Sequence, residues 1–253
     1  MRLKSIWLTL ITLLLLCPIS PAAETGKDGF AVVELFTSEG CSSCPPADEL
    51  LSQLTENARA HNQKVYTLGF HVDYWNRLGW KDPFSHEFYS VRQRQYARVF
   101  KSDRIYTPQM IVNGTKVFLG SDKNLANKTI QQALQTPAAA GIQLNAQFAQ
   151  KTIKIKYTLT GAPAESLINL VLVEGNLKSK ITRGENAGRT LIHQSVVRLF
   201  QSMPVNSPSA EVTLTLDFPI HPQNSTLIAY LQNPETMQII AASKTDLAAS
   251  NLP

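Results

Sequence analysis

The feature that most constrains the fold is a pair of cysteines placed between a predicted strand and a predicted helix. The run FAVVELF (30–36) is short, apolar and rich in valine and aromatic residues, which favours a buried strand. Cys41 and Cys44 follow, and two prolines come directly after them, where proline suits the first turn of a helix. Over residues 46–60, apolar residues recur three and four positions apart and predict one apolar helix face. The cysteines therefore mark a strand-to-helix turn.

This position favours chemistry at sulfur. A helix N-terminus has unpaired amide hydrogens and the positive end of the helix dipole, and both stabilise a thiolate at Cys41. Such placement lowers a cysteine pKa from about 8.5 to between about 3.5 and 7.5, and only the thiolate attacks a disulfide. We predict that Cys41 attacks, that Cys44 resolves the mixed disulfide, and that the two form a Cys41–Cys44 disulfide. A purely structural disulfide is the weaker interpretation, because a two-residue loop offers little entropic stabilisation.

The N-terminus predicts export. Arg2 and Lys4 precede an apolar run at 6–16, and small residues follow, which is typical of a cleaved secretory signal over 1–23. The run is too short for a membrane span, which needs about 20 residues. We expect a periplasmic or secreted bacterial protein, without membrane association after cleavage. Loss of the two basic residues lowers the formal net charge from +5 to +3, and the absence of a basic cluster argues against nucleic acid as a partner.

The pattern of predicted elements changes near residue 137. Before it, strands and helices alternate, and the first strand–helix–strand unit predicts parallel pairing. After it, seven short strands separated by Gly, Pro, Asn and Ser predict an antiparallel β-sandwich. We therefore predict an α/β domain over 28–136 and a separate all-β domain over 140–245. Within the first, strands are expected at 30–36 and 64–72 and in a hairpin around Asn113-Gly114, and helices at 46–60, 82–100 (capped by Asp82) and 121–135.

The first domain resembles the thioredoxin-like fold, through the cysteine pair and the proline before QMIVNG (109–114). In that fold a cis proline begins the third core strand and faces the cysteines. The resemblance implies that Pro108 is cis and that Thr107 presents a docked partner. It also implies that Glu34 is the buried acid that helps to move the resolving proton, although Glu34 lies one residue further from the cysteines than expected. Gly40 stands where those proteins usually have tryptophan.

Three longer stretches carry a closer resemblance. VVELFTSEGCSSCPPAD (32–48), FHVDYWNRLGWKDPFS (70–85) and RGENAGRT (183–190) are similar to the DUF1223 family of exported bacterial proteins. The similarity spans nearly all of the chain after the predicted signal. It implies an exported protein with a thioredoxin-like N-terminal part. That family has no assigned activity, so the predicted function rests on the sulfur chemistry.

A loop rich in aromatic and polar residues follows the second predicted strand. The carboxyl end of that strand should lie at the same sheet edge as Cys41, and ligand sites favour this edge of a parallel sheet. We predict that the loop walls the cysteine cleft and selects the substrate through His71, Asp73, Tyr74, Trp75 and Trp80. The alternative is that at least one tryptophan anchors the loop in the core, because large aromatics bury so much area.

The stretch 183–190 has two interpretations. In the first, its polar residues form a turn that fixes two strands. In the second, the turn folds over the first domain near the cysteines. The polar residues are Arg183, Glu185, Asn186 and Arg189. The sequence alone does not choose between these two arrangements.

We predict an exported thiol–disulfide oxidoreductase without a metal or other cofactor. Its partners would be protein thiols or disulfides, or small thiols, together with an unidentified redox partner. The alternative is a copper-binding or non-catalytic binding protein, in which Cys41, Cys44 and His71 hold Cu(I) through soft thiolate ligands. Zinc is disfavoured, because a closed zinc site needs four ligands and a second ligand pair is missing.

Overall fold

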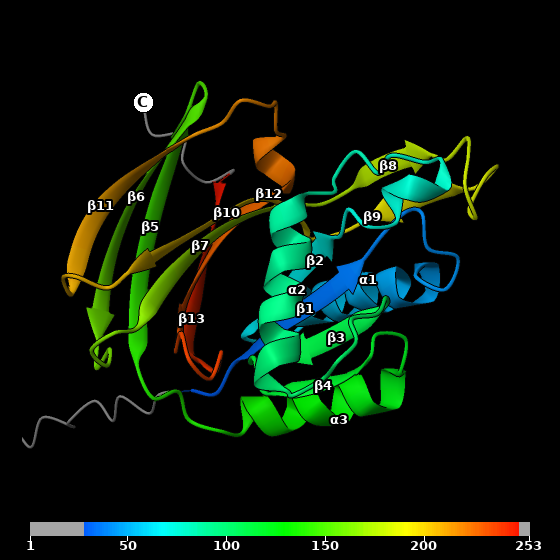
Figure 1. Ribbon diagram of the computed structural model, residues 1–253. Helices are drawn as coiled ribbons and strands as arrows, with labels where there is room; N and C mark the ends of the chain where they lie inside the picture. The colour runs from blue at the N-terminus through cyan, green and yellow to red at the C-terminus, as the bar shows by residue number, and fades with distance from the viewer. Residues whose placement is uncertain (1–27, 248–253) are drawn as a thin grey trace, which may run out of the picture.

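The computed structural model describes residues 28–247, so the predicted signal at 1–23 lies outside the described residues. The first half of the chain alternates strands and helices, much as its pattern predicts (Figure 1). Its elements are β1 (Ala31–Thr37), α1 (Pro45–Ala60), β2 (Val65–His71), a short 3-10 helix η1 (Asn76–Leu78), α2 (Glu87–Val99), β3 (Gln109–Val112), β4 (Lys116–Leu119) and α3 (Lys123–Leu134).

The second half is built almost entirely of strands. They are β5 (Gly141–Ala149), β6 (Thr152–Thr160), β7 (Leu167–Glu174), β8 (Leu177–Lys180), β9 (Thr190–His193), β10 (Val196–Pro204), β11 (Ser209–Thr215), β12 (Ser225–Gln232) and β13 (Ile239–Asp246), with a 3-10 helix η2 (Pro222–Asn224). The seven strands predicted for this half are thus too few. The stretch 189–200 was predicted as one strand, but a turn divides it into β9 and β10, and β8 was not predicted.

The predicted fold class, an α/β domain followed by a separate β-sandwich, is wrong. Strands of both halves form one eight-stranded mixed sheet, in the order β13-β12-β7-β10-β2-β1-β3-β4. The halves meet where Val196 of β10 pairs in parallel with Gly69 of β2, and Gly69 N donates to the Ser195 carbonyl over 2.8 Å. A β-carbon at position 69 would lie 3.3 Å from that carbonyl, so glycine permits the close approach of the two chains.

The side chains on the two faces of the sheet explain why the halves merge. One core, beneath α2, combines Phe36 and Phe70 of the first half with Val171 and Tyr230 of the second. Alternate residues of β7 point the other way, where the three-stranded sheet β11-β6-β5 covers them. Helices α1 and α3 cover the opposite face of β1 and β3 from α2. The strand β7 is therefore buried on both faces, as central strands of covered sheets are.

Within the first half, most predicted elements are present. β1 and β2 pair in parallel, as predicted, and Asn113 and Gly114 form the β3–β4 turn with φ angles of 47° and 69°. Helix α2, however, begins at Glu87 instead of Asp82, and His86 caps it by accepting from Phe88 N. The Asp82 carboxylate is occupied elsewhere, in the buried network described below.

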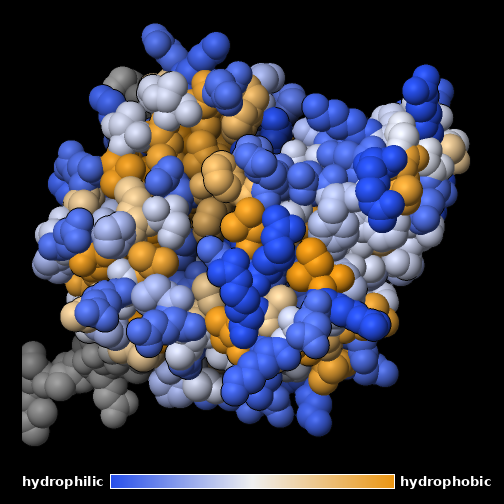
Figure 2. All heavy atoms as spheres, in the orientation of Figure 1, coloured by the Kyte–Doolittle hydropathy of each residue, from blue (hydrophilic) through white to orange (hydrophobic). Residues whose placement is uncertain are grey.

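The β8–β9 hairpin projects from the second half toward the start of α1, beside the segment that carries η1 (Figure 1). The surface seen from this side carries strongly hydrophilic residues across α2 and hydrophobic residues over the strands of the second half (Figure 2). Among the described residues, helices are too short or too polar to cross a membrane.

Candidate active site

The two cysteines form a disulfide at the N-terminus of α1. Cys44 is the N-cap of the helix, and its amide donates to the Cys41 carbonyl over 3.2 Å. The two Cα atoms lie 5.4 Å apart, which is ordinary disulfide geometry. Both cysteines have 0% exposed surface, although Ser42 and Ser43 between them are exposed. The cysteine pair therefore lies at the start of a helix, and it is covered.

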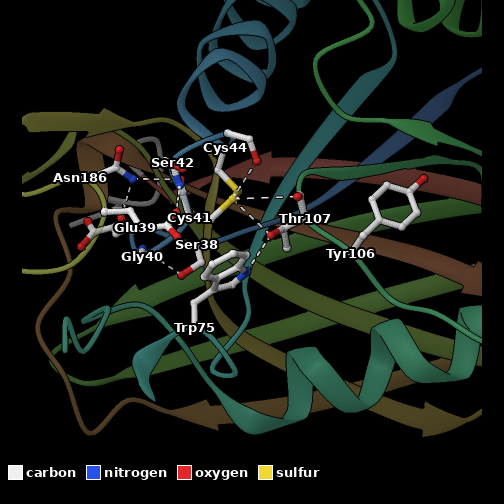
Figure 3. Close-up of a disulfide and its surroundings, with 12 residues drawn as sticks. Ser38, Glu39, Gly40, Cys41, Ser42, Cys44, Trp75, Tyr106, Thr107 and Asn186 are labelled. Atoms are coloured by element: carbon white, nitrogen blue, oxygen red, sulfur yellow. Dashed lines mark hydrogen bonds between the residues drawn. A yellow bond between two sulfur atoms is a disulfide. The ribbon is translucent and has the colours of Figure 1, made fainter. Parts of the chain in front are cut away.

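Thr107 covers the sulfur of Cys41 on one side (Figure 3). Its hydroxyl donates to Cys41 Sγ over 3.3 Å, and the Thr107–Pro108 peptide bond is cis. Trp75 Nε1 donates to the same hydroxyl over 2.7 Å, which fixes the threonine side chain. Ser43 Oγ lies 3.3 Å from Cys41 Sγ as well. The structure thus brings Thr107, Pro108 and Trp75 to the cysteines.

Trp75 also lies against the residue before Cys41. A β-carbon at Gly40 would lie 3.2 Å from the Trp75 Cβ, which is closer than ordinary packing. Glycine at position 40 therefore leaves room for an indole that comes from the loop after β2.

The turn between β8 and β9 covers the cysteine motif on the other side. We call residues 181–189 the strap. The Asn186 side chain donates to the carbonyls of Glu39 (2.8 Å) and Cys41 (2.9 Å), and the Glu185 carboxylate accepts from Ser42 N over 3.0 Å. Hydrogen bonds from the side chain and the amide of Ser42 lower the pKa of Glu185. Of the two interpretations of this stretch, the structure has the turn folded over the cysteines.

Glu39 connects the motif to its surroundings from a fully buried position. Its carboxylate accepts from Trp80 Nε1 (2.7 Å) and from His193 Nε2 (3.1 Å), and its amide donates to Asp82 Oδ2 (2.8 Å). Together with the bond from Asn186, these contacts attach the residue two before Cys41 to three distant segments. Trp80 therefore acts here as an anchor of the motif.

Asp82 and His71 form a buried pair behind the motif, with Asp82 Oδ2 2.7 Å from His71 Nδ1. Burial lowers the pKa of His71, but the Asp82 carboxylate raises it more, so the histidine pKa lies above its ordinary value. Burial raises the pKa of Asp82, yet His71 and the amides of Glu39 and Phe84 bring it below its ordinary value. Each group therefore favours the charged form of the other, and the pair contacts the motif through the Glu39 amide.

Asp48 is a buried carboxylate that the sequence analysis missed. It lies one helical turn after Cys44, and residues spaced by four share a helix face. Its side chain is 91% buried, and neither Asp48 Oδ2 nor the Thr37 hydroxyl has a well-formed hydrogen bond within residues 28–247. Burial raises the pKa of Asp48, and the nearby His193, His71 and Thr37 moderate that rise. A charged residue on an otherwise apolar helix face was the signal that could have identified it.

Two predicted site residues are held away from the disulfide. Glu34 points to the α2 face of β1, where its carboxylate binds Arg92 Nε over 2.7 Å and the Tyr96 hydroxyl. Asp73 lies at the start of the loop after β2, and its carboxylate accepts a hydrogen bond from Ser90 Oγ of α2. The Tyr74 hydroxyl donates to Gln93 on the same helix, and burial raises the pKa of Tyr74 to about 12.

Glu39 and His193 were also missed, whereas Asn186 belonged to one of the two interpretations of the stretch 183–190. They reach the site through tertiary contacts across more than 140 residues of chain, and sequence spacing carries no signal for such contacts.

His71 was the predicted third ligand of a copper site, and in the structure its Nδ1 is bound to Asp82. Within residues 28–247, His, Cys, Asp and Glu side chains do not gather in groups of three or more that could hold a metal ion. The copper alternative therefore gains no support from the arrangement of these residues.

Comparisons with known proteins agree with the fold. The model of a family described as "Protein of unknown function (DUF1223)" matches residues 32–232. The crystal structure of protein AGR_C_4864 from Agrobacterium tumefaciens is similar with a TM-score of 0.64 and 24% identity, over 88% of this chain and 96% of that one. HBP35 of Porphyromonas gingivalis is similar with a TM-score of 0.62 and 16% identity, over 88% and 76%. At these identities the likeness shows the fold alone. No protein with a curated description matches this chain.

Proposed function

Since this chain belongs to the DUF1223 family, whose members are described only as proteins of unknown function, we propose its function from the site: thiol–disulfide exchange at Cys41 and Cys44. The observation that carries the proposal is the disulfide at the start of α1, in contact with the hydroxyl of Thr107 before a cis proline. In this one feature the chain resembles thioredoxin-like proteins. A helix N-terminus stabilises a thiolate there once the disulfide is reduced.

The exchange follows from the two sulfurs. A substrate thiolate attacks Cys41 Sγ, the Cys41–Cys44 bond breaks, and Cys44 leaves with the electron pair as a thiolate that takes up a proton. A second substrate thiolate then attacks the substrate sulfur of the mixed disulfide and expels Cys41 as a thiolate. Two substrate thiols are thereby oxidised to a disulfide while the protein gains two electrons and one proton, which Cys44 holds. The second proton goes to solvent, because Cys41 remains a thiolate. The reverse sequence reduces a substrate disulfide.

Asp48 supports the proton transfer that this exchange needs. It lies one turn from Cys44 on the same buried side of α1, and burial raises its pKa toward neutrality. A carboxyl group with a raised pKa is suited to give a proton to the Cys44 thiolate and to take it back. Glu34, predicted for this role from the sequence, is engaged by Arg92 on the other face of β1.

We also propose that the protein acts outside the cytoplasm. The charged, apolar and small residues of 1–23 follow the order of a secretory signal. An oxidising compartment is where a disulfide of this kind is maintained or used.

The thiol chemistry can be tested on the purified reduced protein. We expect the Cys44→Ala variant to keep a Cys41 whose alkylation at neutral pH is faster than that of free cysteine, because its pKa lies below about 8.5. The wild type should have a midpoint potential between about −270 and −120 mV, the range of working redox proteins. The Cys41→Ala variant is the matched control, since Cys44 lies one turn into the helix and should react slowly.

Two results would contradict the proposal. A Cys41 no more reactive than free cysteine would remove the thiolate on which the mechanism depends. A potential far below about −300 mV would identify an inert structural disulfide. One copper ion bound per chain in the reduced protein would instead favour the metal-binding alternative.

A further inference from the structure

We propose that the strap restricts this site to small thiols and disulfides and excludes those carried by folded proteins, an inference that rests on the proposed function. The strap, residues 181–189, would then be the element that determines substrate class. The argument depends on how firmly the strap is held, on what covers the opposite side of the disulfide, and on the burial of both sulfurs.

The strap is a firmly held segment. The Ile181 amide donates to the Arg189 carbonyl and the Gly188 amide donates back to the Ile181 carbonyl, each over 2.9 Å, which closes the base of the strap. The side-chain oxygen of Asn186, Oδ1, accepts a hydrogen bond from Arg189 Nη1 over 3.0 Å. Ile181 and Asn186 are each 1% exposed, so the strap is buried at its first residue and again at Asn186, which faces the motif.

Asn186 attaches the strap to the cysteine motif with every polar group of its side chain used. Its amide donates to the Glu39 and Cys41 carbonyls while its oxygen accepts from Arg189. Glu185 adds a bond to the Ser42 amide. A partner that needs the space occupied by the strap must therefore break three hydrogen bonds to the motif and separate buried surfaces.

The other side of the disulfide is covered more lightly. There the neighbours of Cys41 Sγ are the hydroxyl and the carbonyl of Thr107 (Figure 3). The hydroxyl of the exposed Ser43 lies 3.3 Å from the same sulfur. Hydroxyl groups and exposed side chains reorient in picoseconds to nanoseconds, without backbone movement. Trp75 holds the Thr107 hydroxyl in place, whereas the exposed Ser43 side chain is free to rotate. A small thiol can approach when Ser43 rotates, and it needs no displacement of the strap.

A thiol on a folded protein requires more space around the disulfide. Such a thiol lies on a surface many times wider than a single residue, so its approach to a sulfur with 0% exposed surface forces neighbouring backbone aside. The strap and the Trp75 loop flank the motif on two sides and are both attached to it. The structure thus favours exchange in which two small thiols, RSH, pass two electrons and one proton to the Cys41–Cys44 pair, release the second proton to solvent and leave as RSSR. A small disulfide, accepting the same electrons and protons, returns the protein to its oxidised state.

The test compares a small and a macromolecular reductant on the same disulfide. We would measure the rates at which dithiothreitol and reduced thioredoxin, a folded dithiol protein, open the Cys41–Cys44 disulfide at equal thiol concentration and pH. Insulin, with accessible disulfides, serves as the reference substrate. We expect the ratio of the thioredoxin rate to the dithiothreitol rate to be at least about tenfold lower for this protein than for insulin, because opening the strap costs several hydrogen bonds.

Substitutions in the strap should change this ratio. Asn186→Ala should raise it by about tenfold, since two hydrogen bonds to the motif are lost. Glu185→Ala, at an exposed residue that folding does not depend on, should raise it by about threefold through the loss of one bond. Lys178→Ala, exposed on β8 of the same hairpin, is the matched control and should leave the ratio unchanged.

The outcomes separate the two proposals. In a protein whose disulfide reacts with both reductants, two results would overturn the strap proposal and leave the proposed redox function standing. One is a wild-type ratio of the thioredoxin rate to the dithiothreitol rate equal to that of insulin. The other is a ratio that neither strap variant changes. If neither reductant opens the disulfide in the wild type or in folded strap variants, the proposed function fails and the substrate class fails with it.

Discussion

Replacing Asp48 by asparagine should make the protein more stable and less active. Asp48 is 91% buried on α1, and its Oδ2 has no well-formed hydrogen bond among the described residues. Burial raises its pKa, which means that the folded protein binds the proton of this carboxyl more tightly than the unfolded chain does. Asparagine has nearly the same shape and carries no charge, so the substitution isolates the effect of the carboxylate.

The sign of the stability change follows from the direction of the pKa shift. A carboxyl with a raised pKa contributes to stability below its unfolded pKa of about 3.9, and that contribution is lost as pH rises through the folded-state pKa. In the wild type, a buried charge without a well-formed hydrogen bond then remains. Removing it should stabilise the Asp48→Asn variant by about 1–3 kcal/mol at pH 8, the usual cost of an unsatisfied buried polar group. Near pH 4 the difference should become small, because the carboxyl is protonated in the folded state and about half protonated in the unfolded state.

Urea unfolding of the oxidised proteins at pH 4, 6 and 8 measures this difference, and the rate of exchange with dithiothreitol measures the effect on function. If Asp48 transfers the Cys44 proton, the exchange rate should fall by about 100-fold at pH 8. Glu49→Gln, exposed at the next position of α1, is the control and should change neither quantity. A variant that is less stable than the wild type at pH 8 would contradict this expectation, since the attraction of the nearby His193 and His71 for the carboxylate would then outweigh the cost of its burial.

Two further predictions concern the framework around the site. Gly114→Ala should destabilise the protein by more than about 3 kcal/mol, because the new β-carbon would lie 1.8 Å from the Met237 carbonyl at a φ of +69°. Gly79→Ala, at a φ of +97° with no described atom within 4 Å, should cost only about 1–2 kcal/mol, and equal thermal shifts for the two would count against this. The His71–Asp82 pair should stabilise the fold until pH rises through the raised pKa of His71 or falls through the lowered pKa of Asp82. Asp82→Asn should therefore cost about 3–5 kcal/mol at pH 6 in chemical denaturation and less at pH 9, whereas a pH-independent cost would contradict the pairing.

Local signals in the sequence were sufficient for the strand–disulfide–helix turn. β1, α1 and β2 begin and end within two residues of the predicted bounds, because apolar periodicity and the paired prolines act over a few residues. The Asn113-Gly114 turn between β3 and β4 was predicted for the same reason. Such local signals did not predict the orientation of the Glu34 side chain. Side chains alternate along a strand, so a single residue decides whether the carboxylate faces α1 and the cysteines or, as in the structure, Arg92 on α2.

The joining of the two halves was also beyond local signals, although one clue was present. β7 (Leu167–Glu174) is apolar on both faces, and a strand at the surface of a two-layer sandwich normally alternates. That run indicated a central strand covered on both sides. It carried no information on which strands would lie beside it, because the pairing of β10 with β2 joins residues 127 positions apart at Val196 and Gly69.

The continuous sheet explains how a turn near residue 186 can become part of a site near residue 41. β9 leads through Ser195, whose carbonyl accepts from Gly69 N, into β10 beside β2. Two residues after Gly69, His71 ends β2 and binds Asp82, which in turn accepts from the amide of Glu39. A strap on a separate, freely jointed domain would lose rigid-body entropy each time it covered the motif, and three hydrogen bonds would not offset that loss. Because the sheet already fixes the start of the strap relative to the motif, the same bonds suffice to keep the disulfide covered, and the second half of the chain is a structural part of the disulfide site.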